Sequence, residues 1–216
     1  MLLAVDTSTT RAGIALYDGD VVAEATWQAG RDHGRHLMPL IEQTLARLGR
    51  TPADLTAVAA ARGPGSFTGL RVGLAVARGL QVGLNIPLYG IGSLEVLANG
   101  LPPLDFPVWA ALAAGRGRYA VARFLPTVSE YVLDGDVMGV TLESLLRLAV
   151  GRCGIVGDLD AEARTALSAL GDHVWIAPPA LSVRRPAVLA ERAWQLLQRG
   201  EPPTTDAGEP IYLVRG

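Results

Sequence analysis

The amino-acid sequence predicts an α/β fold built from two similar halves, each with its own β-sheet flanked by helices. Two patterns lead to this prediction. Short β-type runs joined as hairpins are followed by helices that alternate with strands, and the same order then returns in the second half. The composition agrees, because half of the 216 residues are hydrophobic and 19% are charged, enough to bury a sizeable core.

The first half is expected to open with three strands joined by tight turns. An Asp18-Gly19 dipeptide separates two β-type runs, which is a strong hairpin signal. A hydroxyl-rich turn, from Asp6 to Thr10, follows the first run. The expected strands cover residues 2–5, 13–17 and 21–27.

Helices and further strands complete the first half. Apolar residues recur at i, i+3 and i+4 over residues 36–48, which predicts a helix with Pro39 in its first turn and Gly49 at its end. Ser93 is expected to cap a short helix that ends at Asn99. Between them we expect a strand over 55–61, a glycine-rich loop, a helix over 68–84 and a strand over 87–91.

The second half repeats this order after a proline-rich connection. The residues from Leu101 to Asp105, Leu-Pro-Pro-Leu-Asp, make the best linker. We therefore expect one subdomain over residues 1–101 and a smaller one over 102–216, whose last part, from residue 186 or so, folds back on the first. Expected strands cover 107–113, 118–125, 130–134, 154–157 and 173–177, and expected helices cover 141–149, 161–170 and 183–199.

The segment from Arg62 to Arg71, Arg-Gly-Pro-Gly-Ser-Phe-Thr-Gly-Leu-Arg, is the most informative part of the chain. Its glycines allow close approach to another group, and the first N–H groups of the next helix lack intrahelical partners. The segment can therefore hold an anion or pack tightly against another backbone, and both interpretations stay open. A P-loop does not fit because the chain has no lysine, and a Rossmann loop does not fit because Thr68 replaces its third glycine.

The expected helix over 68–84 is apolar on almost every side, so a single sheet cannot cover all of its apolar surface. Gly69, Gly73 and Ala77 form a row of small residues at i+4 spacing, along which another helix can approach closely. Such packing would offset the cost of about 1 kcal/mol for each helical glycine. The cover is either this chain's own helix 36–48 or a partner protein. With a partner, Gly73→Glu or Ala77→Glu should abolish the complex without unfolding the chain.

The sequence shows no cluster of catalytic or metal-ligating residues. His33 and His36 can share a helix face, but no acid accompanies them at metalloprotease spacing, so we expect surface or interface histidines. Cys153 is expected to be a small buried residue rather than a nucleophile. No nucleophile–base pair supports a peptidase.

Charge and cysteine content narrow the class further. A net charge of −2 argues against a protein that binds nucleic acid through its own basic face. Cys153 is the single cysteine, and the first residues do not resemble a signal peptide. The apolar run over 70–91 carries Arg71 and Arg78, which speaks against a membrane span. We therefore expect a cytoplasmic protein.

Five stretches resemble the TsaB (YeaZ) family of bacterial proteins. The stretch from Gly63 to Arg71 is long and specific, and the first hundred residues match almost throughout, whereas the second half matches loosely. Over 113–119 the family often has Asp-Ala-Arg-x-Gly-Glu-Val-Tyr, whereas this chain lacks the aspartate and has Arg118 for the glutamate. The other matching stretches run from Leu3 to Thr9, His33 to Ile41, Pro87 to Leu94 and Pro210 to Arg215.

The resemblance implies two subdomains of the actin/sugar-kinase/Hsp70 (ASKHA) type and a role in making N6-threonylcarbamoyladenosine in tRNA. In that family the protein is a non-catalytic partner of the transferase TsaD, and the ATPase TsaE joins them. A homodimer in the absence of TsaD and only indirect contact with tRNA are also expected. The catalytic paralogue has two histidines four residues apart, where this chain has Ser93 and Leu97, so no catalytic role is expected.

The resemblance also implies where contacts lie. Helices 36–48 and 68–84 would form a shared bundle with the TsaD-type partner. In the ASKHA superfamily the acid that ends the first strand lies near nucleotide phosphates, so ATP or ADP near the heterodimer junction is one role for Asp6, and capping of its own turn is the other. The expected partner residues are His33, His36, Met38, Leu40, Thr68, Leu70, Arg71, Gly73, Leu74, Ala77, Arg78 and Gln81. The expected nucleotide or anion contacts are Asp6, Thr7, Ser8, Gly63, Gly65 and Ser66.

An alternative from a different class is a stand-alone ATP-dependent kinase of small metabolites. Asp6, the hydroxyl-rich turn and the glycine loop would then bind the nucleotide, and calorimetry with Mg-ATP would detect it. A metallopeptidase is the weaker alternative, which metal analysis of the pure protein would test.

Overall fold

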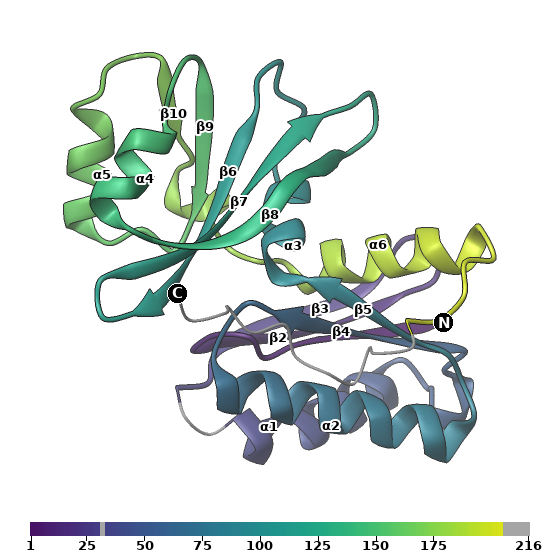
Figure 1. Cartoon of the computed structure of the whole chain (residues 1–216). Coiled ribbons are helices and arrows are strands. Elements are labelled where there is room, and N and C mark those ends of the chain that lie inside the picture. Colours follow the sequence, from purple (N-terminus) through teal and green to yellow (C-terminus); the bar gives the residue numbers. More distant parts are fainter. Residues whose placement is uncertain (31–32, 205–216) are drawn as a thin grey trace. The chain divides into compact units, whose positions relative to one another are not determined.

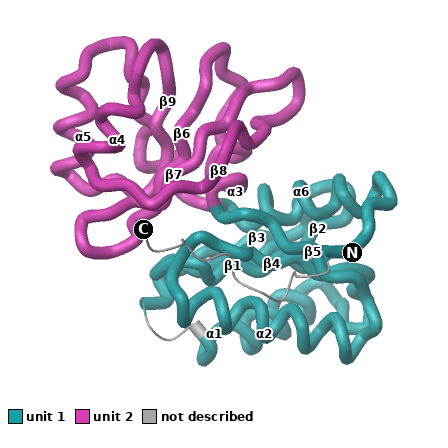
Figure 2. Tube along the Cα trace, in the orientation of Figure 1, with its two compact units in different colours: residues 1–93, 185–211 teal, residues 94–184, 212–216 magenta. Residues whose placement is uncertain are grey.

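The computed structural model describes residues 1–30 and 33–204, with the His33 side chain outside the described part. The chain forms two compact units (Figure 2). Unit 1 contains Met1–Ser93 together with the segment that begins at Arg185, and unit 2 contains Leu94–Arg184. Each unit has its own five-stranded mixed sheet.

The sheet of unit 1 has the strand order β3-β2-β1-β4-β5. Its first three strands form an antiparallel meander, and the last two continue the sheet parallel to β1. β1 is buried along its whole length, which explains its unbroken apolar run, whereas the edge strand β3 is exposed or half-buried throughout. The strands are β1 (Leu2–Asp6), β2 (Arg11–Tyr17), β3 (Val21–Gln28), β4 (Ala57–Gly63) and β5 (Leu88–Gly92).

Three helices cover this sheet, with α1 (His33–Arg47) and α2 (Phe67–Leu84) on one face and α6 (Pro186–Gln198) on the other (Figure 1). The apolar stripe of α1 enters the core formed with β1 and β2. The Ser66 hydroxyl caps α2 by accepting the Gly69 N–H, and a short 3₁₀ turn, Pro52–Asp54, precedes β4. Unit 1 is thus a three-layer α/β unit.

Pro39 does not lie where the sequence predicted. Helix α1 begins at His33, so Pro39 lies in the helix interior rather than in the first turn. A proline has no N–H to donate to the carbonyl of the residue four positions earlier, here Arg35. Arg35 and Pro39 are both exposed, so water can reach this side of the helix and hydrate that carbonyl.

Unit 2 repeats the architecture of unit 1. Its sheet has the order β10-β9-β6-β7-β8, again an antiparallel meander continued by two parallel strands. This confirms the predicted duplicated α/β fold. The strands are β6 (Val108–Gly115), β7 (Arg118–Pro126), β8 (Tyr131–Thr141), β9 (Cys153–Gly157) and β10 (Val174–Ile176), and a 3₁₀ turn spans Pro179–Leu181.

Alternate residues of β6 divide the core of unit 2 into two layers. Ala110 and Leu112 pack with α3 (Ser93–Asn99) on one face of the sheet. Trp109 and Ala111 pack with α4 (Leu142–Leu148) and α5 (Ala161–Ser168) on the other. The first five residues of β6, Val108–Leu112, are therefore buried, with a core layer on each face.

The segment from Leu101 to Asp105 lies within unit 2 and does not link the units as expected. Leu101 is buried in the core that it shares with α3. The Tyr131 hydroxyl donates to the Pro102 carbonyl at 2.9 Å and accepts the Leu104 N–H at 3.0 Å. The boundary between the compact units falls at Ser93 and Leu94 instead of residue 101.

Ser93 also differs from its prediction as a helix cap. It is the first residue of α3, and its hydroxyl is buried without a hydrogen-bond partner among the described residues. Leu94 and Leu97 instead hold α3 in place through the apolar core. Among residues 1–30 and 33–204, no helix is long and apolar enough to cross a membrane.

The N-terminus of α6 is attached to β3 by one carboxylate. Glu24 Oε2 accepts hydrogen bonds from Arg185 Nη2 at 2.6 Å and Nε at 3.2 Å, and Glu24 Oε1 accepts the Ala187 N–H at 3.0 Å. The carboxylate thus pairs with a guanidinium and caps a helix start at once. The ion pair raises the pKa of Arg185.

We expect Glu24→Gln to lower the free energy of unfolding by about 1–2 kcal/mol, because it removes a charge-assisted pair and weakens a cap. Urea unfolding measures this value. The control is Glu143→Gln, whose partner Arg147 lies one turn away on the exposed surface of α4, and which should change stability by less than about 0.5 kcal/mol. Equal effects of the two changes would contradict the role of Glu24.

Candidate functional site

Asp6 organises the turn that follows β1. Its carboxyl group is 2% exposed, and Oδ1 accepts hydrogen bonds from the Ser8 N–H at 2.8 Å and the Ser8 hydroxyl at 2.6 Å. This is the side-chain-to-backbone pattern that stabilises a tight turn. Of the two roles that the sequence left open for Asp6, the turn cap is the one that the geometry displays.

The glycine loop packs directly on this turn. The Ser66 N–H donates to the Ser8 carbonyl at 2.6 Å, and the Thr7 hydroxyl donates to the Gly69 carbonyl at 2.7 Å. Gly65 permits the contact, since a Cβ atom there would lie closer than 3.0 Å to the Ser8 carbonyl oxygen. The six expected anion contacts are thus brought together by two loops, but Asp6, Thr7, Ser8 and Ser66 bond to one another or to nearby backbone.

The row of small residues on α2 faces this chain's own sheet, so its expected role as a partner surface is wrong. Gly69, Gly73 and Ala77 are buried. A Cβ atom on Gly73 would overlap the Thr7 hydroxyl, so the glycine lets the helix approach the end of β1. Gly73→Glu and Ala77→Glu would therefore place a carboxylate in the core, and neither can separate partners while leaving the fold intact.

Leu70 and Leu74 are corrected in the same way, because their side chains are 0% and 3% exposed. Leu74 packs with Val58 and Leu88. Leu40 and Gln81 are half-buried, so a partner can touch only part of each. His33 was also expected at the interface, and its side chain lies outside the described residues.

The remaining predicted partner residues lie on the solvent side of α1 and α2, which we call the α1–α2 face. The two helices lie side by side against the sheet (Figure 1), and a Cβ atom on Gly34 would lie at ordinary contact distance, 3.9 Å, from Val72 Cγ1. The guanidinium of Arg71 stacks over the Phe67 ring at 3.9 Å. The exposed residues of the face include His36, Met38, Phe67, Thr68, Arg71, Ala75, Arg78, Gly79, Val82 and Gly83.

A second row of small residues runs along the exposed side of α2. Ala75, Gly79 and Gly83 follow one another at i+4 spacing, and no atom lies within 4 Å of a Cβ built on either glycine. Val82 beside them is 74% exposed. Sequence periodicity alone could have identified this row, but it gave no reason to prefer it over the buried row one helix face away.

The described part of the chain contains no cluster of side chains that could bind a metal ion. No group of three histidine, cysteine or acidic side chains converges within residues 1–30 and 33–204. Ser93 and Leu97, which stand where the catalytic paralogue has histidines, are 0% and 1% exposed, and Leu97 belongs to an apolar core. These two positions are built for packing.

The two sheets of equal strand order define a two-subdomain α/β protein of the ASKHA type. A structure titled "YeaZ from Pseudomonas aeruginosa" matches with a TM-score of 0.76 at 24% identity, covering 97% of this chain and 99% of that one. Another structure from that organism, titled as an uncharacterized protein with similarity to the peptidase YEAZ, matches with a TM-score of 0.78 at 24% identity, covering 99% of both chains. A 2-dehydro-3-deoxygalactonokinase-like protein of Sinorhizobium meliloti matches with a TM-score of 0.50 at 12% identity, over 89% of this chain and 96% of that one.

A family model described as "TsaD: tRNA N6-adenosine threonylcarbamoyltransferase" matches residues 21–141, more than half of the chain. Proteins named "tRNA threonylcarbamoyladenosine biosynthesis protein TsaB" are similar to it. The Escherichia coli K12 protein is 35% identical over 99 residues (46% of this chain, 43% of the relative), and the Bacillus subtilis 168 protein is 40% identical over 118 residues (54% and 52%). These matches span about half the length of the curated relatives. The chain belongs to the family that this model describes. Its similarity to the proteins named TsaB and to the YeaZ structures supports assignment to the TsaB (YeaZ) group.

Proposed function

We propose that this chain is a non-catalytic subunit for N6-threonylcarbamoyladenosine formation in tRNA, and that it acts by binding a TsaD-type transferase through the α1–α2 face. The names of its relatives support the pathway. The hydrogen bonds within the Asp6 turn, and those between this turn and the glycine loop, support a structural role for a region that other members of the fold use for nucleotides. The cytoplasm, where Cys153 would stay reduced, is the expected location.

The observation that carries the proposal is the exposed row Ala75–Gly79–Gly83 on α2. A glycine in a helix interior costs about 1 kcal/mol relative to alanine, and in the isolated chain nothing packs on Gly79 or Gly83 to offset this cost. Small residues let a second helix approach closely, and Val82 supplies apolar area beside them. A helix of a partner protein that packed on this row would offset the cost of the two glycines and cover the exposed Val82 side chain.

We expect Val82→Glu to weaken the complex with a TsaD-type partner at least about 30-fold, since it places a charge in an apolar contact. Isothermal titration calorimetry measures the affinity. Val128→Glu is the matched control, because Val128 is fully exposed and belongs to unit 2, whereas the α1–α2 face belongs to unit 1. Gly79→Glu should act like Val82→Glu, and circular dichroism should show a native fold for all three variants. Undiminished affinity of Val82→Glu and Gly79→Glu would refute the assigned surface.

A reconstituted modification assay tests the function itself. It would contain tRNA, a TsaD-type transferase, a TsaE-type ATPase and threonylcarbamoyl-adenylate, with and without this chain. The modification rate should fall to background without the chain and with Val82→Glu. A rate that is independent of the chain would overturn the proposed function, whereas normal activity of Val82→Glu would overturn only the surface.

A homodimer through the same face is the expected state in the absence of the transferase. Such a contact would be isologous, so each α2 would meet its own copy. Sedimentation of the chain alone and of Val82→Glu would show whether the two assemblies compete for one surface.

A further inference from the structure

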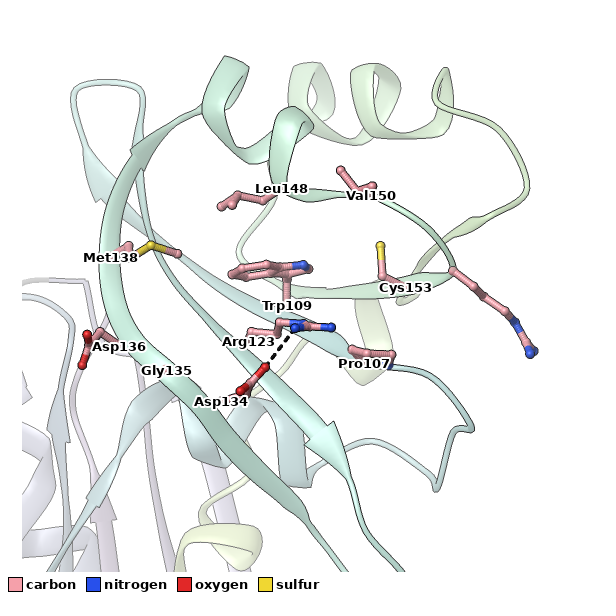
Figure 3. Close-up of a pocket in the computed structure, with 11 residues that line it drawn as sticks. Pro107, Trp109, Arg123, Asp134, Gly135, Asp136, Met138, Leu148, Val150 and Cys153 are labelled. Carbon is pink, nitrogen blue, oxygen red and sulfur yellow. Dashed lines mark hydrogen bonds and ion pairs between the residues drawn. The ribbon is translucent and has the colours of Figure 1, made fainter.

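Unit 2 contains a pocket on the sheet face that α4 and α5 cover only in part. The chain leaves α4 after Leu148 and turns into β9 at Cys153, which leaves the neighbouring stretch of β6, β7 and β8 open (Figure 3). The pocket has a volume of about 520 Å³, within the range of small-molecule sites. All of its lining residues belong to unit 2.

One side of the pocket is apolar and aromatic. The Trp109 ring forms its centre, with Leu148 and Val150 on one side of the ring and Met138 at its edge (Figure 3). Met138 is 36% and Val150 79% exposed, so apolar surface here faces water. Trp109 itself is 8% exposed, so a flat ring in the pocket would cover the apolar surface of Met138 and Val150 and contact the small exposed part of the indole.

The other side of the pocket presents a guanidinium group. Arg123 lies on the opposite side of Trp109 from Leu148, and its Nη1 donates to Asp134 Oδ2 at 2.9 Å (Figure 3). Both partners are about 40% exposed, the range in which an ion pair is weak and can rearrange. A guanidinium has five N–H donors, so Arg123 can hold a second carboxylate beside Asp134.

The lining contains two arginines and two aspartates, so an anion contact depends on the N–H donors that Arg123 keeps beside its pair with Asp134. The Arg152 guanidinium pairs with Asp105 at 2.7 Å and stacks over the Phe106 ring at 4.6 Å, and both partners lie outside the lining. The Asp136 carboxylate points away from Trp109 (Figure 3). Burial raises the pKa of the Cys153 thiol, so the sulfur is neutral at pH 7 and adds no negative charge. We propose that this pocket binds a small aromatic carboxylate, with its ring against Trp109 and its carboxylate on Arg123.

The test uses three naphthalene compounds of similar shape and different charge. Calorimetry with the full chain should show binding of 2-naphthoate, binding at least about tenfold weaker for neutral 2-naphthol, and weaker binding still for the cation 2-naphthylmethylamine. The indole N–H resonance of Trp109, assigned by loss in Trp109→Phe, should shift on addition of 2-naphthoate. No detectable binding of 2-naphthoate, or a preference for the amine, would overturn the proposal.

Arg123→Met tests the anion contact, because methionine keeps an apolar stem and removes the charge. We expect it to weaken 2-naphthoate binding at least about tenfold and to leave 2-naphthol binding unchanged. Arg147→Met is the control, since Arg147 is an exposed arginine of the same unit that does not line the pocket. Equal binding of 2-naphthoate by wild type and Arg123→Met would refute the role of Arg123. Thermal unfolding of each variant verifies its fold.

Discussion

Replacing Gly65 with alanine should destabilise the chain by about 3 kcal/mol, because it pushes apart two backbones that touch. The new Cβ would overlap the Ser8 carbonyl oxygen and crowd the Ser8 carbonyl carbon. Neither backbone can rotate away as a side chain could. The overlap is relieved at the lowest cost in free energy when the loop moves away from the turn. This movement lengthens the hydrogen bond from the Ser66 N–H to the Ser8 carbonyl beyond its present 2.6 Å.

Thermal and urea unfolding measure this effect. For a chain of this size, 3 kcal/mol corresponds to a fall in Tm of roughly 10 °C. Gly83→Ala is the control, since nothing lies within 4 Å of a Cβ at that exposed helical position, and it should raise stability by up to about 1 kcal/mol. A Gly65→Ala chain that unfolds like wild type would mean that the loop and the turn are not held together in solution.

The repeated hairpins made the fold predictable from the sequence. Residues 2–6 are apolar up to Asp6 because β1 is covered on both faces. The Asp18-Gly19 turn marked the hairpin between β2 and β3, with Gly19 at a φ of 84°. The strand β8 was predicted too short, at 130–134 rather than Tyr131–Thr141. Its second part contains Gly135 and Gly139, which are poor strand formers, and the backbone hydrogen bonds of β7 hold it in the sheet instead.

The candidate site was harder to predict, because its contacts join residues far apart in the chain. Helical spacing places Gly69, Gly73 and Ala77 on one face of α2, but it does not show what covers that face. In the structure Thr7 packs against that face, and its hydroxyl donates a hydrogen bond to the Gly69 carbonyl, 62 residues further along the chain. A row of small residues indicates close packing in general, and only the three-dimensional arrangement distinguishes packing within the chain from packing with a partner.

The pocket in unit 2 gave no sequence signal at all. Trp109, Arg123, Asp134 and Cys153 come from four different strands, and each is unremarkable within its own strand. Cys153 was expected to be buried, and it is, at 2% exposed. Its position beside Trp109 and Arg123 follows from the strand order β9-β6-β7-β8, which local patterns do not encode.

A double-mutant cycle on Gly73 and Thr7 tests the packing of the buried row against the end of β1. Gly73→Ala should cost about 2 kcal/mol, since its Cβ would overlap the Thr7 hydroxyl, and the gain in helix propensity offsets only part of this overlap. Thr7→Ala alone should cost about 1 kcal/mol through loss of the hydrogen bond to the Gly69 carbonyl. If Gly73 faced a partner instead, Gly73→Ala would stabilise the isolated chain and Thr7 would not matter.

In the double variant the clash is gone, because the nearest remaining atoms, Thr7 Cβ and Val5 Cγ1, lie 3.5 Å from the new Cβ, an ordinary contact. The double variant should therefore be more stable than the sum of the single effects predicts, by about 3 kcal/mol, because the whole overlap energy disappears while the gain in helix propensity stays. Gly79→Ala combined with Thr7→Ala is the control, and these two changes should add within about 0.5 kcal/mol because nothing joins them. Strict additivity in the Gly73 cycle would show that α2 does not rest on the end of β1, and the α1–α2 face would then need to be redefined.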